Sequence, residues 1–280
     1  MLSRRIFSGF SRFSGNVRRS WSSVAVPELI DSITRTTDGE IDPEIVDETI
    51  KLNPQLLNYG LESWQSVLTT FRSQGFPSYM LMPLIVNHPM ILRKSPEQIT
   101  QGLNKWNTSQ FGEKNVMKLI TKYPTLLEIS NDEMYLSNRI AHLQEYAETR
   151  KNVWTLFMNC PNLISDKTHV IDPKIKYLKQ NMGVNLAEVL KSEVFSKTLL
   201  KIRCRHTFLE RLGVYKAKSY KEDPGEVNNN PKLHQIVDTS DKTFATKIAF
   251  ATLEEYEVFE ELYSRELNDQ DDEESDTDDE

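Results

Sequence analysis

The stretch Tyr123-Pro124-Thr125-Leu126-Leu127 decides the fold, because its pattern recurs along the chain at a nearly constant spacing. A proline followed two and three residues later by large aliphatic residues also occurs at Pro54, Pro89 and Pro161. Successive prolines are separated by 35, 35 and 37 residues. Self-similarity at this period is typical of helical repeat proteins.

Apolar residues precede each proline at positions that share one helical face. They lie eight, five and four residues before it: Leu81, Leu84 and Ile85; Val116, Leu119 and Ile120; Val153, Leu156 and Phe157; and, as a weaker copy, Val46, Thr49 and Ile50. This spacing predicts an amphipathic helix before each proline. Because a residue that precedes proline is disfavoured in the α region, we expect these helices to end at or near Asn53, His88, Tyr123 and Cys160.

Helix-start signals follow the prolines. Ser95–Gln98 and Ser130–Glu133 resemble capping boxes, and Asp42 and Asp172 each stand before a proline, as an N-cap before N1 would. Each unit is therefore expected to contain two helices, which bury their apolar faces against neighbouring units. The sequence predicts an all-α fold, a right-handed-type helical repeat solenoid with a concave basic groove, over residues 41–267.

Composition excludes several classes of protein. No stretch approaches 18 consecutive apolar residues, so no transmembrane helix is expected. The only two cysteines, Cys160 and Cys204, lack the spacing of a zinc site or a disulfide framework and favour a reducing compartment. No glycine-rich phosphate loop, metal-binding spacing or nucleophile–base set is evident, so we expect neither an enzyme nor a bound cofactor or metal.

The formal net charge of −7 combines three regions of different character. Residues 1–27 contain five arginines and no acid, residues 174–221 contain twelve Lys and Arg against three Glu, and residues 269–280 contain nine acids and no base. The arginine- and serine-rich segment 1–25, with apolar residues along one helical face, predicts a mitochondrial presequence and thus a matrix protein. A basic arm that binds nucleic acid is the alternative. Residues 26–40 are expected to form a linker, and residues 268–280 a disordered acidic tail.

The basic segment coincides with a fifth, degenerate repeat, in which Val194-Phe195 replaces the proline marker. Cations on separate helices of a solenoid can follow a nucleic-acid backbone, which predicts a phosphate-binding surface. Its expected members are Lys174, Lys176, Lys179, Lys197, Lys201, Arg203, Arg205, His206 and Arg211. The alternative is a solvated basic face without a ligand.

A final helix is predicted after the capping box Thr252–Glu255. Apolar residues recur on and before it, as they do on a helix that covers the last core layer of a solenoid. A surface that binds a partner protein is the other interpretation. The residues assigned to it are Phe244, Ile248, Phe250, Leu253, Tyr256, Phe259, Leu262 and Tyr263.

The repeat, its Pro-x-Leu-Leu ending and the arginine-rich N-terminus together resemble the mitochondrial transcription termination factor (mTERF) family over about residues 40–265. The most specific local match is Phe195–His206, followed by Leu209 and Gly213, which is similar to the family's C-terminal phrase. Cys204 stands where many members have proline. The Lys-Ile-Arg-x-Arg sequence motif, the aromatic final helix and the acidic tail most resemble those of the fourth animal subfamily.

That resemblance implies a protein that binds mitochondrial large-subunit ribosomal RNA and brings a Sun-family RNA cytosine-5 methyltransferase to the assembling large ribosomal subunit. Control of transcription on mitochondrial DNA is the second hypothesis, although residues 28–173 contain thirteen bases against eighteen acids, which disfavours a long duplex track. A protein-interaction scaffold is the third. Pentatricopeptide repeats have a similar period but do not explain the proline marker.

Overall fold

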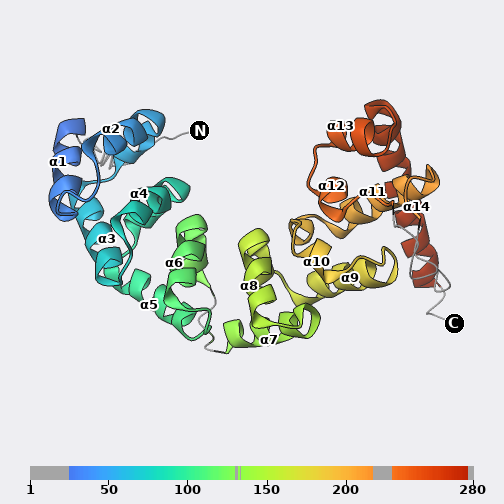
Figure 1. The fold of residues 1–280 in the computed structure, drawn as a ribbon, viewed down its shortest axis with the longest axis horizontal. Helices are drawn as coiled ribbons and strands as arrows, with labels where there is room; N and C mark the ends of the chain where they lie inside the picture. The colour runs from blue at the N-terminus through green and yellow to red at the C-terminus, as the bar shows by residue number, and fades with distance from the viewer. Residues whose placement is uncertain (1–24, 130–131, 133, 217–228, 277–280) are drawn as a thin grey trace, which may run out of the picture. The chain divides into compact units, whose positions relative to one another are not determined.

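The computed structural model describes residues 25–129, 132, 134–216 and 229–276, and every regular element in these ranges is a helix (Figure 1). None of the described helices is long and apolar enough to cross a membrane. The chain divides into two compact units, with the boundary between Pro96 and Glu97, and each is considered separately below. The predicted presequence lies outside the described residues except for its last position, and so does most of the predicted capping box at 130–133.

The first unit contains four α-helices and two short 3₁₀ helices. These are α1 (Val26–Thr36), α2 (Pro43–Leu52), η1 (Pro54–Asn58), α3 (Leu61–Ser73), α4 (Ser78–Asn87) and η2 (Pro89–Arg93). The linker expected over residues 26–40 is wrong, because α1 occupies most of it. Leu29 and Ile33, one helical turn apart, are completely buried where α1 packs on α2 and α3.

The second unit continues the alternation through ten further α-helices, some of them a single turn. Its first part contains α5 (Pro96–Asn107), α6 (Glu113–Lys122), η3 (Pro124–Glu128), α7 (Tyr135–Ala147), α8 (Arg150–Asn159) and η4 (Pro161–Ile164). Its second part contains α9 (Thr168–Gln180), α10 (Leu186–Val189), η5 (Val194–Ser196), α11 (Leu199–Arg211), α12 (Leu233–Val237), α13 (Asp241–Thr243), the π-helical turn η6 (Phe244–Ile248) and α14 (Leu253–Asp276). The predicted all-α repeat solenoid is confirmed.

The four proline markers end helices as predicted. The C-cap residues of α2, α4, α6 and α8 are Asn53, His88, Tyr123 and Cys160, and each has an extended φ between −151° and −131°. The chain then enters a 3₁₀ turn, in which the amide of the residue two positions after the proline donates to the carbonyl of the C-cap residue. This bond measures 3.0 Å from Leu126 to Tyr123. The marker therefore specifies both a helix end and the direction of the next segment.

The apolar residues around each marker form the core. Every stripe residue before Pro89, Pro124 and Pro161 is buried, as are Ile91, Leu92, Leu126, Leu127, Leu163 and Ile164 after them. Trp106 on α5 joins neighbouring elements, because its indole Nε1 donates to the carbonyl of Leu126 over 2.8 Å. Each marker thus turns the chain and supplies side chains to the core between adjacent helices.

The helix starts are predicted less well. Asp42 caps α2 as expected, since its carboxylate accepts from the amide of Glu44 at 2.9 Å. The predicted start at Asp172-Pro173 is wrong: α9 begins at Thr168 and includes Pro173. A proline within a helix removes one backbone hydrogen bond, and packing of the flanking buried residues Ile171 and Tyr177 outweighs that local signal.

Two features at the C-terminal end differ from the marker pattern or from the predicted disorder. Val194–Ser196 keeps the 3₁₀ turn without a proline, with the amide of Ser196 donating to the carbonyl of Glu193 at 2.9 Å.

The acidic segment, expected to be disordered from residue 268, is helical as far as Asp276 because α14 runs through it. Extending an existing helix adds one hydrogen bond for each residue fixed, which favours continuation. Residues 277–280 lie outside the described part.

Gly102 provides a test of the contact between α5 and η3. A Cβ atom at this position would lie 2.6 Å from the carbonyl oxygen of Leu127, which is backbone and cannot move aside cheaply. We expect Gly102→Ala to lower the free energy of unfolding by about 1–3 kcal/mol despite the better helix propensity of alanine. The neighbouring exposed change Gln101→Ala should be nearly neutral. Urea denaturation monitored by circular dichroism measures both, and equal midpoints would show that the two elements do not meet this closely.

Candidate nucleic-acid interface

Helix α11 carries five of the nine residues predicted to bind phosphate, and the fold directs them to different surroundings. It begins where Thr198 caps it, the hydroxyl accepting from the amide of Lys201 at 3.1 Å. Its faces pack against α12 and α14, and across a cavity from α9. The sequence locates the positive charge correctly along the chain, but each side chain has to be assigned to one of these faces.

Arg205 is a structural residue, which corrects its assignment as a phosphate ligand. Its side chain is 2% exposed. The guanidinium donates to the carbonyls of Ile236 and Thr239, the latter at 2.8 Å, and to the carboxylate of Asp241 at 2.8 Å. The bonds join α11 to the segment between α12 and α13. Arg205 therefore ties the last elements of the second unit together and is not available to a ligand.

His206 also lies inside the protein and is removed from the predicted interface. It is 1% exposed, and its Nδ1 is 2.9 Å from the hydroxyl of Tyr177 on α9. The ring of Tyr215 meets it edge to face at a centroid distance of 4.6 Å. Burial lowers the pKa of His206 to about 4, so the imidazole is neutral at neutral pH. It contributes no charge that could attract a phosphate.

Lys174 is the third correction. Its side chain is 5% exposed, and its ammonium donates to the carbonyl of Phe195 at 2.9 Å. Burial lowers its pKa, which the charge of Asp166 partly opposes. The bond links α9 to η5. Lys174 adds positive potential below the surface without presenting a donor at it.

Two further predicted cations are neutralised by carboxylates near the C-terminus. The ammonium of Lys201 lies 2.7 Å from both Asp241 and Glu260. Burial lowers its pKa, but the hydrogen bonds to Asp241 and Glu260 outweigh burial and raise it overall. Arg211 binds the carboxylate of Glu266 on α14 through two contacts of 2.8 and 2.9 Å. Both cations attach α14 to α11.

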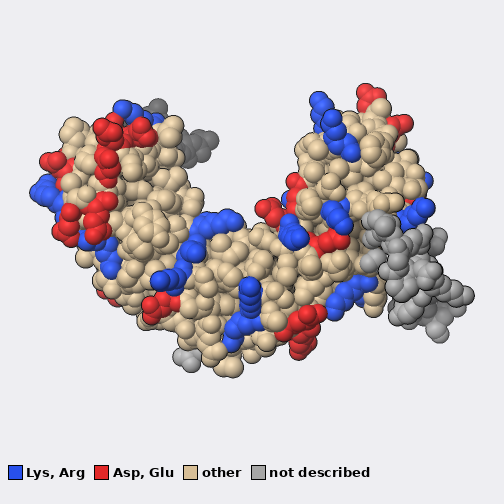
Figure 2. All heavy atoms as spheres, in the orientation of Figure 1, with Lys and Arg blue, Asp and Glu red and all other residues tan. Residues whose placement is uncertain are grey.

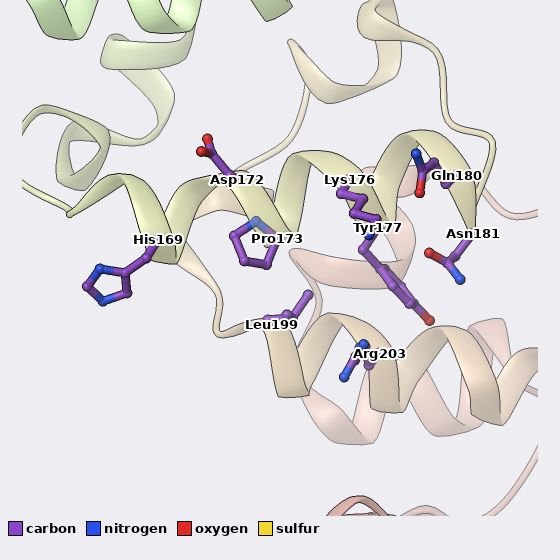
Figure 3. Close-up of a pocket in the computed structure, with 9 residues that line it drawn as sticks. All are labelled: His169, Asp172, Pro173, Lys176, Tyr177, Gln180, Asn181, Leu199 and Arg203. Carbon is purple, nitrogen blue, oxygen red and sulfur yellow. The ribbon is translucent and has the colours of Figure 1, made fainter. Parts of the chain in front are cut away.

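The remaining cations border the space between α9 and α11. A cavity of about 750 Å³ opens there, with Lys176, Gln180 and Asn181 on α9 and Leu199 and Arg203 on α11 among its lining residues (Figure 3). The guanidinium of Arg203 stands 5.5 Å from the ring centroid of Tyr177. Within the described ranges, neither Lys176 nor Arg203 has a carboxylate at ion-pair distance. Among the described residues, the cavity thus holds two cations without an ion-pair partner.

A second cavity, of about 510 Å³, adjoins the first. Lys197, Ser196 and Thr198 line it at the start of α11, and His169, Pro173 and Leu199 line both cavities. Lys179 lies on α9 outside the two cavities, with its ammonium 4.9 Å from the ring centroid of Tyr146. The structure therefore brings together Lys176, Lys197 and Arg203 from the predicted set, and the buried Lys174 also lines the second cavity. Lys179 is exposed on the same helix as Lys176.

Acidic side chains also border these cavities. Asp172 lines the first cavity and Asp166 the second. The carboxylate of Asp172 is 2.8 Å from Nε2 of His142, and the carboxylate of Asp166 accepts a hydrogen bond from the side-chain amide of Asn162 at 2.7 Å. The face drawn in Figure 2 shows Lys and Arg interspersed with Asp and Glu over α10 to α12. The region is a set of local cationic positions and not a continuous basic band on that face.

The predicted partner surface divides in the same way. Phe244 and Tyr256 are fully buried, and Tyr263 is 8% exposed, so these three residues cover the core and cannot contact a partner. Ile248, Leu253 and Phe259 are half-buried, with Phe259 stacked on Tyr263 at 5.5 Å between ring centroids. Phe250 and Leu262 remain largely exposed, at 81% and 56%. Val258, one helical turn before Leu262 on α14, is also exposed, at 58%, and was not among the predicted residues.

The structure also adds residues that the sequence reading missed. Asp241 forms ion pairs with both Arg205 and Lys201. Burial alone would raise the pKa of Asp241, but its hydrogen bonds with these two cations lower it overall. His169, Gln180 and Asn181 line the first cavity. The signal available for them was helical spacing, since 169, 173, 176 and 180 share one face of α9. Polar residues on a helix face are too common to identify a site by themselves.

Metal-ligand groups and free thiols were the remaining candidates for a chemical site. They include no group of three or more His, Cys, Asp or Glu side chains placed to hold a metal ion. Cys160 and Cys204 are buried free thiols, and burial raises the pKa of each to about 11. Thiols of this kind are protonated and unreactive at neutral pH.

Comparison with known proteins agrees with the repeat geometry. The profile of the mTERF family matches residues 38–245, the range that contains all the proline markers and the cavities between α9 and α11. The chain belongs to the mTERF family. The predicted resemblance is confirmed, and the 3₁₀ turns at Pro54, Pro89, Pro124 and Pro161 are its repeat boundaries.

The relatives of this mTERF protein are distant in sequence. Transcription termination factor 4, mitochondrial, of Mus musculus is 22% identical over 180 residues, which cover 64% of this chain and 51% of the mouse protein. Transcription termination factor 1, mitochondrial, of Pongo abelii and of Homo sapiens are each 20% identical over 156 residues, covering 56% of this chain and 39% of theirs. The chain thus matches about half of their length or less. Similarity to factor 4 agrees with the predicted subfamily.

Mutation of the two arginines of the Lys-Ile-Arg-x-Arg sequence is expected to affect stability to very different extents. Arg205→Ala removes a buried charge from Asp241 and leaves two backbone carbonyls without their donor, so the free energy of unfolding should fall by about 3–5 kcal/mol. Arg203→Ala removes only a half-buried contact with Tyr177 and should change the free energy of unfolding by less than about 1 kcal/mol. Urea titration of both variants measures the difference. Similar destabilisation by the two changes would contradict the assignment of Arg205 to the core and Arg203 to the cavity.

Proposed function

We propose that this mTERF protein is a non-enzymatic mitochondrial adaptor that binds large-subunit ribosomal RNA and brings a Sun-family RNA cytosine-5 methyltransferase to the large ribosomal subunit. One observation carries the nucleic-acid part. Lys176 and Arg203 face one cavity from two helices, and neither has a carboxylate partner among the described residues. Two other cations of α11, the half-buried Lys201 and the exposed Arg211, are already paired. Unneutralised cations at an opening between helices are what a phosphate backbone requires.

The mitochondrial location is supported by the arginine-rich residues 1–27 and by the names of the relatives, which are mitochondrial factors. Those names also describe transcription termination, so regulation at mitochondrial DNA is the alternative. RNA is favoured because the available cations are few and close together. A protein that neutralises a long stretch of duplex needs basic residues from several repeats, whereas residues 28–173 contain more acids than bases.

Ultraviolet crosslinking of the tagged protein in intact mitochondria, followed by sequencing of the attached nucleic acid, tests the proposal. We expect large-subunit ribosomal RNA to be enriched. The double variant Lys176→Glu/Arg203→Glu should lose at least about tenfold of that signal, because two attractions become repulsions at the same place. Lys247→Glu, an exposed lysine on η6, is the control and should retain it. Enrichment of mitochondrial DNA instead, with no RNA, would favour transcription control.

The adaptor part of the proposal rests on the exposed apolar side chains near α14. Phe250, Val258 and Leu262 are at least 56% exposed, although neighbouring aromatic residues on the same segment are buried. Exposed apolar residues gathered beside a polar helix face are typical of a protein-binding surface. Glu254, Glu257 and Glu261 are exposed on the same helix, so the matching surface of the enzyme should be apolar with basic residues at its rim.

Leu262→Asp tests this surface. A charge at the centre of an apolar contact should weaken binding of the methyltransferase by about 2 kcal/mol or more, roughly thirtyfold, while leaving the protein folded because Leu262 contributes little to the core. Ile45→Asp, on α2 and similarly exposed at 52%, is a matched control and should bind normally. Co-purification from mitochondria and titration with the purified enzyme measure the effect. Normal binding by Leu262→Asp would remove α14 from the partner interface.

A further inference from the structure

The two cavities between α9 and α11 are adjacent to each other. They share the wall made by His169, Pro173 and Leu199. Lys176 and Arg203 stand on one side of this wall, and Lys197 stands on the other. Lys197 is extended and precedes the helix, and Arg203 lies about one turn into α11, about 6 Å along the axis from Leu199 at 1.5 Å per residue. The cations therefore form two groups separated by a short distance and not a broad patch.

We propose that these cavities hold two consecutive phosphates of a single, unpaired nucleic-acid strand. The proposal rests on the nucleic-acid function above and specifies the kind of ligand. Lys176 and Arg203 hold one phosphate, and Lys197 holds the next beside the first turn of α11. Backbone N–H groups in the first turn of a helix have no intrahelical acceptors, so that end of α11 adds partial positive charge at the second position.

The surroundings of the second position favour an anion further. Lys174 is buried beneath it, donates to the carbonyl of Phe195, and has no carboxylate at ion-pair distance in the described ranges. Because Lys174 also lines this cavity, its charge adds to the positive potential there. Asp166 and Asp172 lie on the α9 side and are held by Asn162 and His142. Their charge directs the strand toward α11.

Size decides between a single strand and a duplex. Cavities of about 750 and 510 Å³ fall in the range that encloses a drug-sized molecule, which suits one or two nucleotides. Two paired strands exceed these volumes, whereas the backbone of one strand can enter them between α9 and the start of α11. A duplex would rest on the rim and reach the exposed lysines only.

Salt dependence of binding tests the assignment with the full chain. A fluorescent 12-nucleotide single-stranded RNA and its duplex form are titrated by anisotropy at several KCl concentrations. We expect tighter binding of the single strand. Each lost phosphate contact should reduce the slope of log affinity against log salt by about 0.7. Because Lys176 and Arg203 share one phosphate, Lys176→Ala/Arg203→Ala should change the slope about as much as either single variant. Lys197→Ala/Arg203→Ala should change it by about twice that amount.

The controls separate this inference from the proposed function. Lys247→Ala should leave affinity and slope unchanged, and circular dichroism should show that every variant is folded. Tighter binding of the duplex, with the same variants still weakening it, would overturn the single-strand assignment and leave nucleic-acid binding in place. Slope changes that simply add for all pairs would overturn the two-phosphate arrangement. Absence of binding to either form would overturn the proposed function itself.

Discussion

The restriction that proline places on the residue before it is the constraint on which this structure depends. Asn53, His88, Tyr123 and Cys160 all leave the α region with similar dihedral angles, and a 3₁₀ turn follows each of them. One local event thus ends a helix, redirects the chain and brings an apolar pair into the core. Repeating it at a nearly constant interval places equivalent apolar faces at equivalent positions. The stacked core then follows from burial, because no single unit can cover its own face.

The same constraint explains why the fold was predictable and where prediction failed. Proline acts through steric contact with its immediate neighbour, so helix ends can be predicted from two residues. Helix starts depend on weaker capping preferences that packing overrides, as at α9, where the helix passes through Pro173. The linker expected before residue 40 was wrong although the sequence carries a helical signal there. Val26, Leu29, Ile30 and Ile33 recur at helical spacing, and Leu29 and Ile33 are fully buried in α1.

The functional surface could be predicted only in part, because the sequence shows where charged residues lie along the chain but not which way their side chains point. Arg203 and Arg205 are two positions apart on one helix and therefore point about 200° apart, one to the cavity and the other into the core. Arg205, Lys201 and Arg211 find their partners in Asp241, Glu260 and Glu266, which lie 36 to 59 positions later in the chain. Without knowing that α14 returns to α11, the sequence offered no means of pairing them. The net charge of +9 over residues 174–221 is consequently much larger than the charge left to face a ligand.

Helix α11 serves both proposed interfaces, and this sharing connects them. Arg203 lies on its α9 side, and Lys201 and Arg211 bind acids of α14. Arg205 points into the core, about 200° away from Arg203, and fixes α11 against the segment that leads to α13 and η6. Because these side chains are paired with carboxylates, the proposed phosphate contacts are left to the α9 side of α11. Asp241, Glu260 and Glu266 together occupy the cations of α11 other than Arg203.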